Sequence, residues 1–417
     1  MSTVPDLKIS PARLMESLAA LGQVGALAGG GVNRLALTDA DRLGRDWTVA
    51  RMRALGMAVT IDAIGNVTAI YAGTADTKDL APVMTGSHID TVRTGGLYDG
   101  NYGVLAGLEV VATLQEAGVR LRRPIAVAFF TNEEGARFQP DMMGSLVYVG
   151  GLPLAEALAT RATDGYTVEE ELQRIGYQGP AAVGCPVVDS FVELHIEQGP
   201  VLHQQGLRIG VVEGVQGISW TEFTIEGVSN HAGTTPMALR HDAGVAAVRI
   251  AAFVHELALR HGGPQLATVG SIQLSPNLIN VIAHRAVFTV DLRHTDEATL
   301  ARAEAEVQAF AAQCAAAQGV ACSHRRLARF EPVVFDPMVT ALIAQETQAL
   351  GLPALRLPSG AGHDAQMLAR VCPSGMIFVP SVNGLSHNVN EFTEPDDLAL
   401  GAQVLLQVLV RLAQRDA

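Results

Sequence analysis

Positive charge is scarce in this 417-residue chain: 29 Lys and Arg residues stand against 42 Asp and Glu residues, giving a formal net charge of −13. A chain with this balance repels nucleic-acid phosphates and anionic lipid surfaces, so we expect neither nucleic acid nor membrane as a partner. An anionic ligand must then be held by a local group of Arg or His side chains. Only 17% of residues are charged and 48% are hydrophobic, which is typical of a well-buried soluble protein.

Cysteine is also rare, and its spacing excludes a paired thiol motif. The four cysteines form no C-x-x-C pair and are expected to be reduced core residues of a cytoplasmic protein: Cys185, Cys314, Cys322 and Cys372. The first residues, MSTVPDLKIS, lack a basic segment followed by an apolar one, which argues against a secretory signal. The segment 18–31, rich in Ala, Gly and Leu, lacks the unbroken length of a membrane span.

The length of the chain and its hydrophobic patterning predict two domains. A single core usually divides below this length. The runs PIAVAFF and GMIFVP are nearly continuous apolar stretches, typical of strands covered on both faces in a mostly parallel α/β sheet. Stretches 218–227, 266–274 and 286–293 instead mix polar and apolar positions, and helical stretches 241–260 and 296–318 accompany them, which predicts an antiparallel sheet with helices on one face. We therefore expect an α/β domain over 1–211 and 330–417, with an α+β domain inserted at 212–329.

Four β-prone runs of the larger domain each lead to side chains that bind divalent metals. LAPVMTGSHID ends at His88, PIAVAFFTNEEG at Glu133 and Glu134, SFVELHIEQG carries His195, and GMIFVPSVNGLSH leads to His387. Ligands of parallel sheets gather beyond the carboxyl ends of the strands. A solvated turn with incidental charges would account for one such cluster, but it is a poor explanation for four.

Imidazole and carboxylate groups are suitable ligands for divalent transition metals, and two ions that share a bridging carboxylate need about five protein ligands. The sequence offers five candidates: His88, Asp99, Glu134, His195 and His387. Asp90, two residues beyond His88, is placed to hold that imidazole in orientation.

Seven motifs in chain order carry a family resemblance: GSHIDTVRTGGLYDG, TNEEGARF, ELHIEQGPVL, NHAGTTPM, NVI…FTVDLRHTD, SGAGHDAQ and GLSHN. Together they resemble the M20-type metallohydrolases, and among these the hydantoinase/carbamoylase branch, most of all the N-carbamoyl-L-amino-acid hydrolases. The resemblance extends from about residue 10 to the C-terminus. It implies two divalent ions per chain, one held by His88, Asp99 and His195 and the other by Asp99, Glu134 and His387. Zn²⁺ is the expected metal, with Mn²⁺, Co²⁺ and Ni²⁺ as alternatives.

The resemblance also implies roles for other residues. Glu133 would be the general base and His231 would stabilise the oxyanion. Arg293 is suited to a substrate carboxylate because its guanidinium pairs with two oxygens at once, and Asn280 is suited to an amide. Further candidates for substrate contact are Gln198, Gln216 and the backbone of Gly360, Ala361 and Gly362, while His363 and Asp364 are expected to brace that loop. The inserted domain would act as a lid and form a homodimer in which the histidine reaches the partner's active site.

The predicted activity is metal-dependent hydrolysis of the carbamoyl group of N-carbamoyl-L-amino acids to the L-amino acid, CO₂ and ammonia. Allantoate amidohydrolase and β-ureidopropionase are the near alternatives, since they share this chemistry. An M20 dipeptidase is disfavoured because many peptidase relatives carry an acidic residue where this chain has His195. A non-catalytic protein that binds metal or amino acid is disfavoured by Glu133, because simple binding needs no base beside the ligands.

Overall fold

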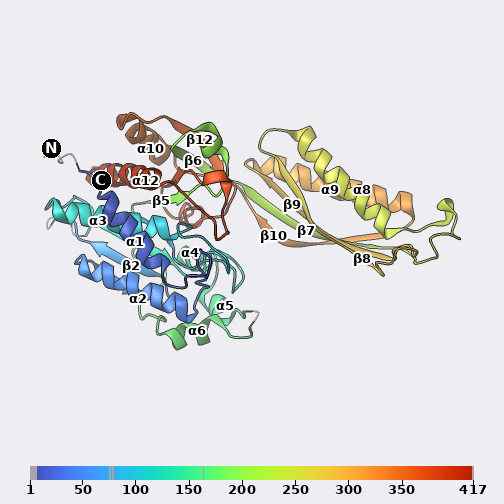
Figure 1. Cartoon of the computed structure of the whole chain (residues 1–417), viewed down its shortest axis with the longest axis horizontal. Helices are drawn as coiled ribbons and strands as arrows, with labels where there is room; N and C mark the ends of the chain where they lie inside the picture. Colours follow the sequence, from blue (N-terminus) through green and yellow to red (C-terminus); the bar gives the residue numbers. More distant parts are fainter. Residues whose placement is uncertain (1–6, 75–76, 78, 163, 416–417) are drawn as a thin grey trace. The chain divides into compact units, whose positions relative to one another are not determined.

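The computed structural model describes residues 7–74, 77, 79–162 and 164–415. The chain divides into two compact units (Figure 1): unit 1 comprises residues 1–213 and 334–417, and unit 2 comprises residues 214–333. The boundaries expected from the sequence, 212 and 329, fall two and four residues before those of unit 2.

Unit 1 is built on one nine-stranded sheet in the order β1-β2-β4-β3-β5-β13-β6-β11, with β12 paired to β6. The four central strands β4, β3, β5 and β13 are parallel, whereas β1, β2 and β6 pair antiparallel at the two sides. The mostly parallel sheet expected from the apolar runs is therefore confirmed at its centre. The strands are β1 (Ala58–Ile61), β2 (Val67–Tyr71), β3 (Val83–His88), β4 (Ile125–Phe130), β5 (Ser190–Ile196), β6 (Ile209–Val215), β11 (Val333–Val334), β12 (Ala354–Ser359) and β13 (Ser374–Val379).

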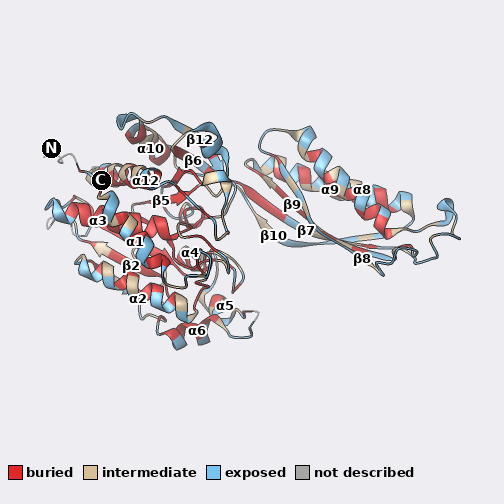
Figure 2. Ribbon diagram, in the orientation of Figure 1, coloured by how far each residue is buried: buried red, intermediate tan, exposed pale blue. Residues whose placement is uncertain are grey.

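The core of unit 1 lies between these central strands and the helices that cover them. Every residue of β3, β4, β5 and β13 is buried, as is most of α3 (Asn101–Glu116) and α12 (Pro395–Gln414). Red marks the buried residues in Figure 2, for example along β5. Such packing holds the carboxyl ends of the strands in fixed positions. The other helices of unit 1 are α1 (Pro11–Gly22), α2 (Asp39–Ala54), α4 (Met143–Tyr148), α5 (Leu154–Ala159), α6 (Val168–Ile175), α7 (Val201–Gln205), α10 (Pro337–Ala349), α11 (Asp364–Leu368) and the 3₁₀ turn η3 (Val382–Gly384).

Unit 2 is a four-stranded antiparallel sheet in the order β10-β7-β9-β8, packed against two helices. Alternate residues of β9 are buried, and Phe223 and Phe288 stack with ring centroids 5.2 Å apart in a core that also includes Ile250 and Val307. The antiparallel sheet and both helices expected from the sequence are confirmed. The elements are β7 (Gly217–Glu226), η2 (Met237–Leu239), α8 (Ala243–His261), β8 (Leu266–Ser275), β9 (Arg285–His294), α9 (Glu297–Gln318) and β10 (Ala321–Phe330).

No helix among the described residues is long and apolar enough to cross a membrane. The four cysteines are all free thiols, and Cys314 and Cys372 are buried, but Cys185 is exposed, so the interpretation of the cysteines as core residues is wrong for Cys185. Cys185 lies in the loop before β5, where neighbouring apolar residues such as Val187 are themselves exposed.

Candidate active site

The carboxyl ends of the parallel strands bring the predicted metal ligands together in unit 1. His88 is the last residue of β3, His195 is the second-last residue of β5, and Glu134 follows the end of β4. Asp99 lies two residues before α3, and His387 lies in the loop after β13. Because β4, β3, β5 and β13 are parallel neighbours, their ends meet along one edge of the sheet.

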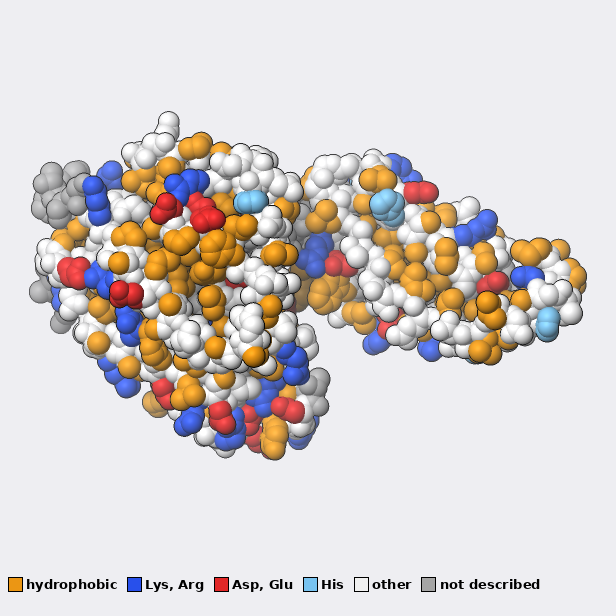
Figure 3. All heavy atoms as spheres, viewed as in Figure 1, with side chains coloured by type: hydrophobic (Ala, Val, Ile, Leu, Met, Phe, Trp, Pro, Cys, Tyr) orange, Lys and Arg blue, Asp and Glu red, His pale blue; other side chains and the backbone are white. Residues whose placement is uncertain are grey.

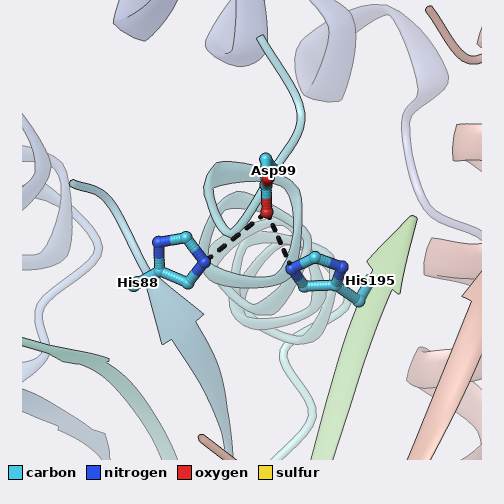
Figure 4. Close-up of side chains that lie close together, drawn as sticks. All are labelled: His88, Asp99 and His195. Atoms are coloured by element: carbon cyan, nitrogen blue, oxygen red, sulfur yellow. Dashed lines mark ion pairs between the residues drawn. The ribbon is translucent and has the colours of Figure 1, made fainter. Parts of the chain in front are cut away.

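Two imidazoles face one oxygen of Asp99 (Figure 4). His195 Nε2 lies 3.3 Å from Asp99 Oδ1, and His88 Nε2 lies 3.6 Å from the same oxygen. Gly100, directly after Asp99, has a φ angle of 66°, and a Cβ atom there would overlap the ring of His88. The glycine therefore allows the turn before α3 to pass close to the imidazole.

The other oxygen of Asp99 faces a second group. His387 Nε2 lies 3.3 Å from Asp99 Oδ2 and 3.2 Å from Glu134 Oε2. Within each group, one ligand atom per residue lies within 4.8 Å of the others, and both groups contain Asp99. Imidazole nitrogens and carboxylate oxygens at this spacing fit two divalent transition-metal ions that share the carboxylate of Asp99.

The outer nitrogens of the two buried imidazoles contact backbone carbonyls. His88 Nδ1 lies 2.9 Å from the carbonyl oxygen of Asp90, and His195 Nδ1 lies 2.8 Å from that of Ile196. These contacts orient each ring so that Nε2 points to Asp99. The carboxylate of Asp90 instead accepts the backbone N–H groups of Glu133 and Glu134, both at 3.3 Å. The sequence placed the side chain of Asp90 against His88, whereas its closest Oδ atom lies 4.0 Å from the ring.

Glu133 is buried beside the ligands, with Oε2 3.3 Å from His88 Nε2. Burial raises the pKa of this carboxyl well above its usual range, and the nearby carboxylates of Asp364 and Glu134 act in the same direction. Divalent cations at the adjacent groups would oppose this effect, because a bound ion is the largest local charge in such a site. A buried carboxyl with its pKa set by such neighbours is suited to exchanging a proton.

The predicted metal ligands shift one another's pKa values. Burial disfavours the charged form of Asp99, but hydrogen bonds from His195, His387 and His88 outweigh it and hold its pKa well below the ordinary value. Hydrogen bonds to Asp99 and Glu134 raise the pKa of His387 to about 11. In the metal-free protein these histidines therefore serve as the positive partners of the carboxylates, a place that cations take when they bind.

A cavity of about 110 Å³ opens at this cluster. Besides the ligands and Glu133, its walls include Gln198, Ala361 and Asp141. Gln198 Nε2 donates to Asp99 Oδ2 at 3.0 Å, so this side chain touches the shared carboxylate. This cavity is smaller than a hollow of about 520 Å³ elsewhere in unit 1, so volume alone does not identify the site. The larger hollow is lined by Arg208 and Asp397, which form an ion pair with each other.

Comparison with known proteins agrees with this arrangement. Residues 84–411 match the family described as Peptidase family M20/M25/M40. The chain belongs to this family. It is 40% identical to an N-carbamoyl-L-amino-acid amidohydrolase of Rhizobium meliloti over 98% of this chain and 97% of the relative. It is 34% identical to the allantoate amidohydrolase of Bacillus subtilis, over 94% and 95% of the two chains.

A solved structure places the chain more narrowly within the family. The crystal structure of an amidase of the hydantoinase/carbamoylase family from Burkholderia multivorans is 43% identical and superposes with a TM-score of 0.95, covering 99% of this chain and 100% of that one. This M20 chain is therefore a hydrolase of the hydantoinase/carbamoylase family that acts on an amide bond.

The loop 359–364 of the M20 chain lies at the cavity and is held by contacts of His363. His363 Nε2 lies 2.8 Å from Ser359 Oγ, and its ring packs against that of His195 at a centroid distance of 4.6 Å. Burial lowers the pKa of His363 well below its usual value and raises that of Asp364 to about 8. Ala361 and Gly362 line the cavity.

Unit 2 of the M20 chain brings His231 and Asn280 together but holds Arg293 apart from them. His231 forms a bridge with Val281, and Ala232 N donates to the carbonyl of Asn280 at 3.0 Å. This pairing continues outward from the Glu226–Arg285 end of the β7–β9 ladder, whereas Arg293 pairs with Ile218 at the other end. Eight residue steps separate Glu226 from Ile218, which corresponds to about 26 Å along the strand.

Arg293 and Gln216, both predicted to contact substrate, have different surroundings in the structure. Arg293 donates to Asp291, with Nη2 2.9 Å from Oδ2. Gln216 joins β6 to β7 in the chain and is buried, and its Oε1 has no hydrogen-bond partner among the described residues.

Sequence reasoning missed three acidic residues around the site. Glu193 is a fully buried carboxylate in β5 that accepts from Ser87 Oγ at 2.6 Å and from Ala365 N at 2.7 Å. Its signal was a lone acid inside the apolar run SFVELHI. Asp141 lines the cavity without any motif to mark it. Glu391 is buried four residues after His387, in a stretch where GLSHN drew attention to the histidine alone.

Proposed function

We propose that this protein hydrolyses the carbamoyl group of N-carbamoyl-L-amino acids with two divalent metal ions per chain. The observation that carries the proposal is Asp99, whose Oδ1 faces His88 and His195 and whose Oδ2 faces His387, with Glu133 buried alongside. The relatives at about 40% identity that are named as N-carbamoyl-L-amino-acid amidohydrolases support this substrate class. The reaction consumes one water and yields the L-amino acid, CO₂ and ammonia.

The residues of unit 1 have distinct tasks in this proposal. His88, Asp99 and His195 hold one ion, while Asp99, Glu134 and His387 hold the other, with Zn²⁺ as the proposed metal. When bound, the ions supply Lewis-acid chemistry, which acidifies a water and polarises the ureido oxygen. Glu133 accepts the proton of the attacking water and delivers it to the departing nitrogen. Asp90 fixes the turn that carries Glu133 and Glu134 through their backbone N–H groups.

Residues of unit 2 recognise the substrate in this proposal. Arg293 pairs with its carboxylate, Asn280 contacts the carbamoyl group and His231 stabilises the oxyanion by donating a hydrogen bond. Gln198 and Gln216 and the backbone of Gly360 and Ala361 supply further polar contacts.

The separation within unit 2 favours a homodimer. An N-carbamoyl amino acid is only a few bonds long, whereas about 26 Å of strand separates the end of the ladder next to His231 from the end at Arg293, so both residues are unsuited to contact one substrate molecule without a second copy of the chain. Sharing of His231 and Asn280 with the partner's active site is therefore proposed. The surface suited to this contact combines the edge strand β8 with exposed apolar residues, namely Val245 and Val248 of α8 and Leu278 and Ile279. Hydrophobic side chains are visible over α8 and α9 in Figure 3.

The second candidate is allantoate amidohydrolase, favoured by the relative with that name. A panel of N-carbamoyl-L-amino acids, N-carbamoyl-β-alanine, allantoate and dipeptides, assayed for ammonia or amino-acid release with Zn²⁺- or Mn²⁺-loaded protein, distinguishes the candidates. We expect the highest kcat/KM for an N-carbamoyl-L-amino acid. Preference for allantoate would favour the second candidate, and turnover of dipeptides alone would overturn both.

A further inference from the structure

Glu391 links the two segments that carry Asp99 and His387. Its Oε1 accepts the backbone N–H groups of Tyr98 at 3.1 Å and Asp99 at 3.2 Å. Its Oε2 accepts the hydroxyl of Ser386, the residue before His387, at 3.0 Å. A single carboxylate thus joins the turn before α3 to a loop nearly three hundred residues later in the chain.

The loop that carries His387 depends on such a link. Unlike His88 and His195, which are part of buried strands, His387 lies outside the helices and strands, with a φ angle of 53° and a half-exposed side chain. Ser386 Oγ lies 3.4 Å from Asp99 Oδ2 and 3.0 Å from Glu391 Oε2. Since a hydroxyl has one proton, the shorter contact holds it, and Glu391 thereby fixes the residue next to the ligand.

Burial of Glu391 is costly, which argues for a task beyond stability. It is 5% exposed, and among the described residues its side chain is hydrogen-bonded by N–H and O–H groups alone and forms no ion pair with Lys or Arg. A carboxylate buried near another carboxylate, Asp99, destabilises the metal-free fold. Gly96 makes room for it, because a Cβ atom at Gly96 would overlap the carboxyl of Glu391.

We infer that Glu391 is a positioning residue that sets the spacing between Asp99 and His387 and so determines the affinity of the ion held by Asp99, Glu134 and His387. The ion held by His88, Asp99 and His195 depends on it less, because both of its imidazoles come from buried strands. This inference rests on the proposed metal sites and adds a separate requirement for one of them. Loss of a residue that orients a ligand typically weakens metal binding 10- to 100-fold.

The test measures Co²⁺ binding to the metal-free full-length protein by equilibrium dialysis and visible absorption. Wild type should bind two ions. Glu391→Ala should weaken one binding step about 10- to 100-fold and leave the other within about threefold. Glu391→Gln keeps a carbonyl oxygen for the two N–H groups and an amide that donates to Ser386, so it should restore most of the affinity. Glu394→Ala, an exposed acid three residues along, is the matched control and should bind both ions normally.

A second variant keeps the test decisive if Glu391→Ala folds poorly. Gly96 is not among the glycines with a positive φ angle, and the three atoms nearest to an added Cβ all belong to Glu391, so Gly96→Ala should push against Glu391 and weaken the same binding step. Equal weakening of both ions, or none in either variant, would overturn the inference while leaving two-metal binding intact. Failure of wild type to bind Co²⁺ would instead overturn the metal sites themselves.

Discussion

His231 and Arg293 lie toward opposite ends of the four-stranded sheet of unit 2: Arg293 pairs with Ile218 at one end of the β7–β9 ladder, and His231 lies beyond Glu226 at the other end, eight residue steps from Ile218. Two side chains so placed in one chain suggest that a small substrate which contacts both must lie between two chains.

His231→Ala and Glu133→Gln should each be nearly inactive alone, and a mixture whose subunits have exchanged should recover activity. In a mixed dimer, one site would combine an intact Glu133 with the partner's intact histidine, while the other would lack both. Random exchange makes half of the dimers mixed, so recovery should approach about a quarter of wild-type activity. Ammonia release is measured before and after subunit exchange, with His231→Ala mixed with itself as the control. An exchanged mixture that stays inactive would show that His231 acts within its own chain.

Glu133→Gln should keep about two metal ions per chain yet lose about 10²- to 10⁴-fold in kcat, because only proton transfer is removed. The amide side chain has nearly the same shape as the carboxylate, and the substitution leaves the backbone contact with Asp90 in place. Metal content by elemental analysis and steady-state kinetics check the two parts separately. Loss of metal in parallel with activity would assign Glu133 to the ligands.

Arg293→Ala should lower kcat/KM for N-carbamoyl-L-amino acids about 30- to 150-fold, since a charge-assisted pair with a carboxylate contributes about 2–3 kcal/mol. Arg293→Lys should recover part of the loss, because an ammonium group does not form the two-point contact. The carboxamide analogue of the same substrate is the control. Equal losses on both substrates would show that Arg293, which also binds Asp291, supports unit 2 instead.

Metal affinity should rise with pH because His387 must lose a proton to become a ligand. In the metal-free protein the pKa of His387 is raised to about 11 by Asp99 and Glu134, so at neutral pH it is protonated and ion binding releases that proton. Below about pH 11, where His387 is protonated in the metal-free protein, one released proton gives up to about a tenfold gain in affinity per pH unit. Calorimetry in buffers of different ionisation enthalpy measures the protons released.

The raised pKa of His387 also makes the stability of the metal-free fold depend on pH. A raised histidine pKa stabilises the folded state fully below about 6.5, and this contribution is lost as the pH rises through about 11. The urea midpoint of metal-free wild type should therefore fall from pH 7 to pH 9 more steeply than that of His387→Gln. Parallel curves would show that His387 is not paired with the carboxylates in solution.

The sequence predicted the structure well where the hydrophobic pattern of a segment matches its burial in the fold. Fully apolar runs predicted the parallel strands, and the ligand-type residues at their ends lie together because those strands are neighbours. Strand β10 was not predicted, since ACSHRRLARF is largely polar and exposed at the edge of its sheet, where burial imposes no alternation.

The sequence pattern did not predict contacts between side chains and backbone groups that only the folded chain brings together. The spacing of Asp90 and His88 suggested a side-chain contact, but the chain turns so that the backbone carbonyl of Asp90 meets the ring. Glu391 and Asp99 are 292 residues apart, and no periodicity signals that one accepts the N–H of the other. The separation of His231 from Arg293 likewise follows from strand register, which the motifs alone do not contain.

The proposed metal ligands lie in unit 1 and His231 lies in unit 2, which has a consequence for how the enzyme becomes active. Both proposed ligand groups and Glu133 come from unit 1, so under the proposed metal sites a single chain would contain all the residues that hold its ions. Under the proposed sharing of His231, a metal-loaded monomer would be inactive until it formed a dimer with a second copy. Dilution would then reduce the activity per chain while the metal content stayed constant, and protein concentration itself would act as the switch for turnover.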